Sequence, residues 1–244
     1  FERDTNTKQK AFFGELSYKM TEQLTATIGG RYFDYDRMDS QTFTIIGITF
    51  WEDRETPTEE TGQTYKANLT YTPNEDTMIY GQWVEGFRLG RGFSPSPACD
   101  TDNDGNVDGL GIPVPNRIDS DTSENFELGL KTSLADNRIT LNAALYRINW
   151  DGIPVSTSVT TACSLLLNAG ESKSEGIELE VQTRLAENLL LDMSASYGEA
   201  TLTNDVPSLS AVKGDNLPGS ADYNISLGLE YGFTLAQHDG FARF

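Results

Sequence analysis

Apolar and polar residues alternate one by one through most of this chain, and this period of two is typical of strands rather than helices. In segment 223–233 one face is apolar and the other carries Asn, Ser, Gly and Glu. The same alternation occupies 126–134, 176–185 and 189–197. Within 139–150 the apolar phase moves from odd to even positions, which either a β-bulge or the end of an apolar layer would explain. The sequence therefore predicts an all-β fold whose strands have one apolar face.

About ten strands are expected, and their lengths favour a membrane. They are predicted over 10–20, 23–35, 62–72, 77–87, 123–134, 138–149, 172–185, 189–200, 222–233 and from near 240. Strands of soluble proteins most often have ~5–6 residues. A tilted strand that crosses a membrane needs ~9–11 residues, so the predicted lengths fit a membrane barrel better.

The connections between these strands are alternately short and long. The short turns are 21–23, 73–76, 135–137 and 186–188, and the long loops are 36–61, 88–122, 150–171 and 201–221. Aromatic residues lie near both ends of the strands, for example Tyr223 and Tyr231. Outer-membrane barrels have short periplasmic turns, long extracellular loops and an aromatic girdle at each interface. We therefore expect an antiparallel transmembrane β-barrel whose apolar face contacts outer-membrane lipid.

The acidic composition agrees with a polar lumen and excludes one class of partner. The chain has 37 Asp and Glu against 18 Lys and Arg, a net charge of -19, so it is not expected to bind nucleic acid, whose phosphates need basic residues. Only 37% of the residues are hydrophobic, against ~45–50% in soluble domains. The residues expected to face the lumen are Glu15, Lys19, Arg31, Lys66, Glu127, Lys131, Glu178, Glu180, Arg184 and Glu230.

No enzyme activity is predicted. His238 is the only histidine and lies in a polar turn, without the nucleophile and acidic partner that a hydrolytic triad requires. The pair Glu178 and Glu180 shares one strand face, and a solvated lumen wall explains it better than a pair of glycosidase acids.

Five motifs resemble those of TonB-dependent outer-membrane receptors, and they occur in the family's order. The segments are 77–93 (TMIYGQWVEGFRLGRGF), 124–131 (ENFELGLK), 138–146 (RITLNAALY), 168–180 (NAGESKSEGIELE) and 214–219 (GDNLPG). The first is similar to the family's Y-x-x-x-x-x-G-F-[KR]-x-G-G-F, except that Arg91 stands where the family usually has the first of two glycines.

The resemblance implies a larger parent protein, with a plug domain inside a barrel of 22 strands. Residues 1–244 would then be an internal part of the barrel domain, without the plug, and further strands would follow Phe244. Ten strands in an open sheet would leave two unpaired edges, which lipid does not tolerate. Neighbouring strands are therefore expected from outside residues 1–244, and the strand at 10–20 is not expected to pair with the strand near 240. The implied function is TonB-coupled uptake of a scarce nutrient, most often a ferric siderophore or similar iron complex, with TonB acting through the plug. A passive porin or structural barrel complete with ten strands is the alternative, and a soluble acidic β-sandwich is a third reading.

Two features of the long loops suggest further sites. Cys99 and Cys163 belong to two loops at the same rim, where they can pair as a disulfide or stay as separate thiols. Arg88, Arg91, Arg117, Trp51 and Phe93 are loop residues able to contact a ligand, or simply to be solvated.

A calcium site is predicted in segment 100–108 (DTDNDGNVD). Asp100, Asp102, Asp104 and Asp108 supply oxygen donors at the first, third, fifth and ninth places, and Gly105 stands where a calcium loop turns sharply. Gly111 replaces the bidentate Glu of an EF-hand at the twelfth place. A solvated turn rich in Asp, Asn and Gly is the alternative, and no other cofactor is expected.

Overall fold

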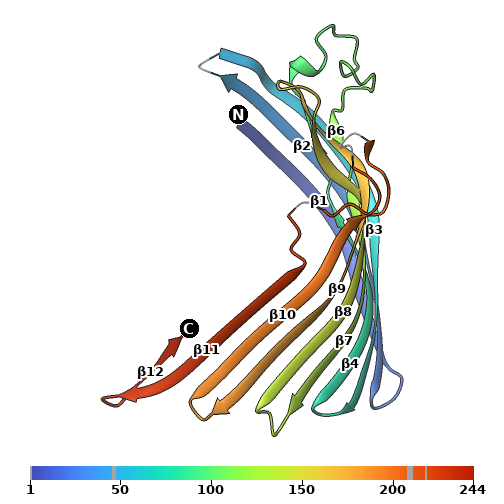
Figure 1. The fold of residues 1–244 in the computed structure, drawn as a ribbon. Coiled ribbons are helices and arrows are strands. Elements are labelled where there is room, and N and C mark those ends of the chain that lie inside the picture. The colour runs from blue at the N-terminus through green and yellow to red at the C-terminus, as the bar shows by residue number, and fades with distance from the viewer. Residues whose placement is uncertain (1, 46–47, 208–210, 218) are drawn as a thin grey trace.

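Ten antiparallel strands form one curved sheet in the computed structural model, which describes residues 2–45, 48–207, 211–217 and 219–244 (Figure 1). The sheet consists of β1 (Glu2–Lys19), β2 (Leu24–Ile45), β3 (Ile48–Asn74), β4 (Thr77–Arg88), β7 (Asp121–Leu134), β8 (Ile139–Ser158), β9 (Ser164–Ala186), β10 (Leu189–Leu202), β11 (Tyr223–Leu235) and β12 (His238–Arg243). A second, two-stranded sheet pairs β5 (Arg91–Gly92) with β6 (Arg117–Ile118). The 3₁₀ helix η1 (Pro97–Cys99) follows β5. Among the described residues, no helix is long and apolar enough to cross a membrane.

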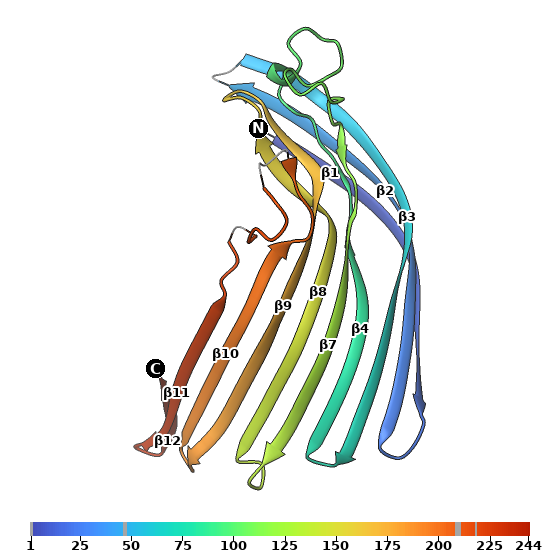
Figure 2. The same cartoon turned by 45° about the vertical axis from the view of Figure 1, so that its right-hand side comes forward.

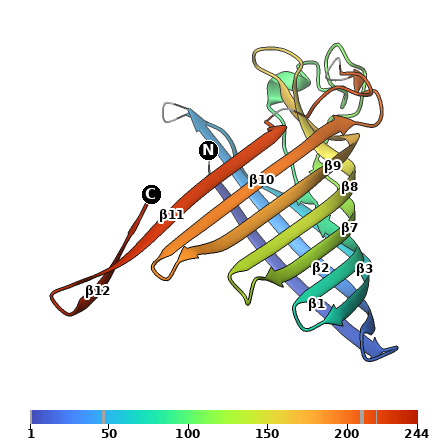
Figure 3. The same cartoon turned by 60° about the horizontal axis from the view of Figure 1, so that its bottom comes forward.

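Every strand of the large sheet pairs with its neighbours in chain order, which confirms the predicted antiparallel all-β fold. The sheet curves into part of a barrel wall, with the short turns at one rim and the long connections at the other (Figures 2 and 3). β1 and β12 are the two edges, and the described strands show no pairing between them, as expected.

Two of the predicted loops, 36–61 and 150–171, are largely strand, so this part of the prediction is wrong. β2 pairs with β3 from Leu24 and Tyr71 up to Ile45 and Ile48. β8 likewise pairs with β9 up to Ser158 and Ser164. These upper parts lie beyond the apolar layer of the sheet, so their side chains need no apolar alternation, and the backbone pairing satisfies their amides without it. Loops 88–122 and 201–221 are mostly irregular, as predicted.

The two faces of the sheet differ as a membrane barrel requires. Large apolar side chains are exposed along the outer face, among them Phe12, Leu16, Ile28, Leu128, Leu145, Ile225 and Leu227. The inner face carries ion pairs and hydrogen bonds that involve the predicted lumen residues Glu15, Lys66, Glu180 and Glu230. Lys66 pairs with Glu15, Arg243 pairs with Glu230, and Asn142 donates to Glu180. Exposed apolar groups on one side of a charged inner face fit lipid outside and a polar lumen inside.

The phase change in 139–150 comes from the end of the apolar layer rather than from a bulge. β8 and β9 keep a continuous register from Ile139 to Asp151. Above Leu145 the outward positions are the polar residues Arg147 and Asn149. Tyr146 points inward, and its hydroxyl lies so close to Gly176 that a β-carbon at position 176 would clash with it.

Candidate ligand site at the mouth of the barrel

Loop 88–122 bends inward at the extracellular rim and lies against the polar face of β2 and β3. The backbone N–H of Gly92 donates to Asp39 Oδ2 at 2.8 Å. A β-carbon at Gly92 would stand only 2.6 Å from Cβ of Thr56 on β3, so only glycine permits this close approach. The loop thus narrows the lumen near its mouth instead of projecting freely into solvent.

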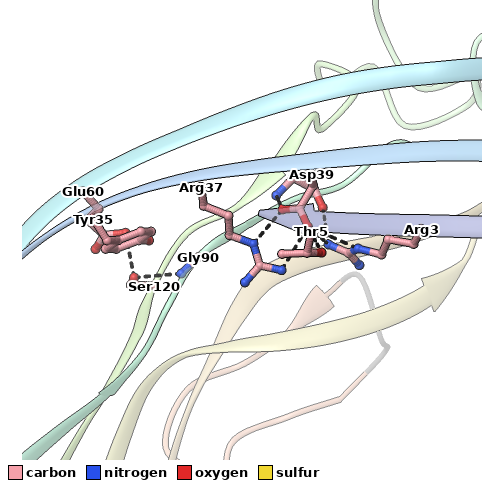
Figure 4. A network of polar contacts seen from close by, with 9 residues as sticks. Arg3, Thr5, Tyr35, Arg37, Asp39, Glu60, Gly90 and Ser120 are labelled. Carbon is pink, nitrogen blue, oxygen red and sulfur yellow. Dashed lines mark hydrogen bonds and ion pairs between the residues drawn. The ribbon is translucent and has the colours of Figure 1, made fainter. Parts of the chain in front are cut away.

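Asp39 is fully buried and is the anchor of this contact (Figure 4). Its carboxylate accepts hydrogen bonds from Arg37 Nε at 2.8 Å, from Arg3 Nη2 at 2.8 Å and from Thr5 Oγ1 at 2.8 Å. Arg3 also donates to the carbonyl oxygen of Gly92 at 3.2 Å. Burial by itself raises the pKa of Asp39, but the hydrogen bonds from Arg37, Arg3 and Gly92 outweigh it and hold this pKa well below its ordinary value.

A second polar chain joins the same loop to the β2–β3 hairpin. Tyr35 Oη and Ser120 Oγ both donate to Glu60 Oε2, at 2.8 Å and 2.6 Å. The backbone N–H of Gly90 donates to Ser120 Oγ at 3.0 Å (Figure 4). Both ends of loop 88–122 are therefore held at the inner side of the hairpin.

Asp121, at the start of β7, holds a third group of charged and aromatic side chains. Arg88 donates to both of its carboxylate oxygens, from Nε at 3.0 Å and from Nη2 at 2.7 Å. Trp150 Nε1 donates to Asp121 Oδ2 at 2.6 Å, and the Arg88 guanidinium lies 5.3 Å from the centre of a Trp150 ring. The Asp121 side chain is only 3% exposed while that of Arg88 is 60% exposed, so Arg88 is held in one orientation with a face open to solvent.

These groups concentrate positive charge in a strongly acidic chain. Arg3, Arg37, Arg88 and Arg91 come together around two buried carboxylates, those of Asp39 and Asp121. Arginine is well suited to carboxylate and phosphate groups because its planar guanidinium offers paired donors. The mouth of the lumen is therefore equipped to receive an anionic ligand.

The structure joins Cys99 to Cys163 as a disulfide, with the two Cα atoms 4.9 Å apart. Val107 and Leu165 pack with the disulfide in a small buried core. The Asn168 side chain adds hydrogen bonds to both the backbone N–H and the carbonyl of Asp119. Loop 88–122 is thus fixed to the β8–β9 hairpin on one side and to the β2–β3 hairpin on the other.

The acidic segment 100–108 brings three of its four aspartates together. Carboxylate oxygens of Asp100, Asp102 and Asp108 lie within 4.8 Å of one another, whereas Asp104 accepts a hydrogen bond from the N–H of Asn106. Asp108 also accepts from the N–H of Thr101 at 3.1 Å. Three carboxylates at this spacing can hold a hard divalent cation, but the hydrogen bonds also account for the turn by themselves.

Arg117 lies beside this site, since its backbone pairs with Gly92 in the β5–β6 sheet, but its side chain forms a surface ion pair with Asp119. The side chain of Trp51 lies outside the described residues, and His238 is exposed at the start of β12, directly after the β11–β12 turn.

Asp39, Arg37 and Arg3 were missed by sequence reasoning. One sequence signal could have found two of them. Arg37 and Asp39 are two positions apart, so they lie on the same face if the strand that begins at Leu24 continues through them.

The curved sheet with an apolar outer face, a polar inner face and long loops at one rim defines the wall of an outer-membrane β-barrel. The family described as "TonB dependent receptor-like, beta-barrel" matches residues 1–244, and the chain belongs to this family. Its members are outer-membrane receptors of Gram-negative bacteria and not enzymes, which agrees with the predicted location and with the absence of catalysis.

Comparisons with individual proteins agree with this assignment. A "Probable TonB-dependent siderophore receptor PiuA" of Acinetobacter baumannii is 27% identical over 147 residues, which cover 58% of this chain and 18% of that protein. The ferric yersiniabactin uptake receptor FyuA from Yersinia pestis superimposes with a TM-score of 0.73 at 18% identity, over 99% of this chain and 34% of FyuA. The ferric preacinetobactin receptor BauA from A. baumannii gives 0.67 at 16% identity, over 98% of this chain and 32% of BauA. The chain thus spans about a third or less of these relatives.

Proposed function

We propose that this chain is part of the barrel wall of a receptor that takes up a metal chelate, such as a ferric siderophore, by TonB-coupled active transport. The observation that carries the proposal is the arginine-rich mouth formed by Arg3, Arg37, Arg88 and Arg91 on the lumen side. Membership of the receptor family supports it. So do the names of the relatives, which refer to a siderophore, to ferric yersiniabactin and to ferric preacinetobactin.

TonB would act through a plug domain elsewhere in the parent protein. The polar inner face of the wall, with the Lys66–Glu15 and Arg243–Glu230 pairs, is suited to contact such a plug because hydrated charges cost little there. The fixed loop 88–122 supports a receptor over a passive porin, since it places charged side chains across the entrance instead of leaving it open.

The test is uptake in a Gram-negative strain that lacks its own iron receptors and expresses the receptor containing these strands. Radioactive iron is supplied as a series of ferric chelates, with and without a functional TonB. Accumulation of at least one chelate only when TonB is present would support the proposal. Equal accumulation without TonB would identify a passive porin instead, and no accumulation of any chelate above the empty-vector level would refute uptake.

A further inference from the structure

Arg91 is the residue by which the chain departs from the glycine-rich motif of its family, and its environment is unusual. It lies in β5, next to Gly92, whose N–H and carbonyl are bound by Asp39 and Arg3. The backbone of Arg91 pairs with Ile118 of β6, and Arg91 is only partly exposed. Within the described part of the chain, no hydrogen bond or ion pair is found for its guanidinium.

The surroundings of Arg91 are positively charged. Burial lowers the pKa of Arg91, the nearby guanidinium groups of Arg3, Arg37 and Arg88 lower it further, and Asp39 raises it. Asp39 cannot serve as its partner, because its two oxygens already accept hydrogen bonds from Arg3, Arg37, Thr5 and Gly92. A partly buried guanidinium without a counter-ion is costly, and an anion from outside the chain would remove this cost.

We propose that Arg91, backed by Arg3 and Arg37, binds a free carboxylate group of an anionic ligand at the mouth of the lumen. Lipid is not the source of this anion, because these residues lie on the inner side of the sheet, opposite the exposed apolar face. The inference rests on the proposed function and names its substrate class: a metal chelate that carries free carboxylates, rather than a neutral or cationic one.

The geometry allows such a group to bind without displacing the internal contacts. Arg37 uses Nε and Nη2 for Asp39, and Arg3 uses Nε and Nη2 for Asp39 and Gly92, so each keeps its Nη1 for another acceptor. Arg91 contributes a whole guanidinium, which can bind a carboxylate through two parallel hydrogen bonds.

The experiment measures binding of citrate, as a carboxylate probe, to the purified full-length receptor in detergent by isothermal titration calorimetry at low salt. We expect wild-type protein to bind citrate and Arg91→Gln to bind it about tenfold or more weakly, since charge-assisted hydrogen bonds are lost. Arg91→Lys should recover part of the affinity because it keeps the charge. The control is Arg117→Gln, on the same loop but paired with Asp119 at the surface, and it should bind like wild type.

Arg91→Gln relieves repulsion within the arginine cluster and is expected to fold at least as well as wild type, which heat-dependent mobility on gels can verify. The proposal is overturned if wild type binds no citrate at millimolar concentration, or if Arg91→Gln binds as tightly as wild type. Citrate binding does not require TonB, so an intact site combined with failed uptake would refute the transport proposal alone. If TonB-dependent uptake is found only for neutral chelates, and this uptake is unchanged in Arg91→Gln, the anion site is refuted while the transport proposal stands.

Discussion

Replacing Asp39 by Asn should loosen loop 88–122 around Gly92, where Asp39 holds it against the inner face of the barrel. The substitution keeps the shape of the side chain but removes the charge that compensates Arg3 and Arg37, whose side chains are only 22% and 17% exposed. Breaking a buried ion pair by neutralising one partner costs about 3–5 kcal/mol. Because both arginines keep some solvent and Asn retains one acceptor, the lower value of about 3 kcal/mol is expected for local opening.

Hydrogen–deuterium exchange of peptides covering 88–96, measured on the intact receptor, reports this opening directly. A loss of about 3 kcal/mol corresponds to roughly 10²-fold faster exchange at Gly92. The matched control is Asp119→Asn, which removes a loop carboxylate that is 65% exposed and paired with Arg117. Exposed pairs contribute only about 0–1 kcal/mol, so exchange in the control should change by about fivefold at most. If Asp39→Asn exchanges no faster than Asp119→Asn, Asp39 is not the anchor of the loop.

Three further outcomes follow from the same region. Burial raises the pKa of Asp39 less than its hydrogen bonds lower it, so the carboxylate has a lower pKa in the folded protein than in the unfolded chain. Protection of the Gly92 amide from hydrogen exchange should therefore be constant above about pH 5 and be lost only in stronger acid. Loss of this protection between pH 8 and 6 would contradict the prediction. Thiol labelling of the unreduced protein should detect neither Cys99 nor Cys163, and two reactive thiols would exclude the bridge. Calcium titration should show weak binding, with a dissociation constant of ~10⁻⁴–10⁻³ M. Asp102→Ala should abolish this binding, whereas Asp104→Ala should largely keep it. If both variants behave like wild type, segment 100–108 is only a turn and not a calcium site.

The sequence predicts the membrane part of the fold well because lipid imposes a strict rule there. Where one face contacts hydrocarbon, every second residue must be apolar, as in Ile225 and Leu227, and the strand is visible in the residues alone. Above the membrane this rule ends, so the extension of β2 and β3 through Asp39 has no apolar signature and resembles a solvated loop.

The candidate site was predictable only in part, for the same reason. Arg88 and Arg91 stand in a motif and attract notice, but Asp121, the partner of Arg88, lies 33 positions away in the chain. That Gly92 meets Asp39 depends on the inward bend of a loop, and such long-range contacts are set by tertiary packing rather than by local pattern. The disulfide joins Cys99 and Cys163, and their positions in the sequence do not determine how close the two residues lie in space.

The Cys99–Cys163 bond has a consequence for how the barrel is assembled. The 64 positions that separate the two cysteines include both β7 and β8, so the covalent ring passes down through the membrane and back up. In Gram-negative bacteria the machinery that oxidises cysteines works in the periplasm, on the side opposite to these loops in the finished protein. The ring is therefore best closed before the loops are exported across the outer membrane, and β7 and β8 would then enter the bilayer together as a pre-joined hairpin rather than one strand at a time.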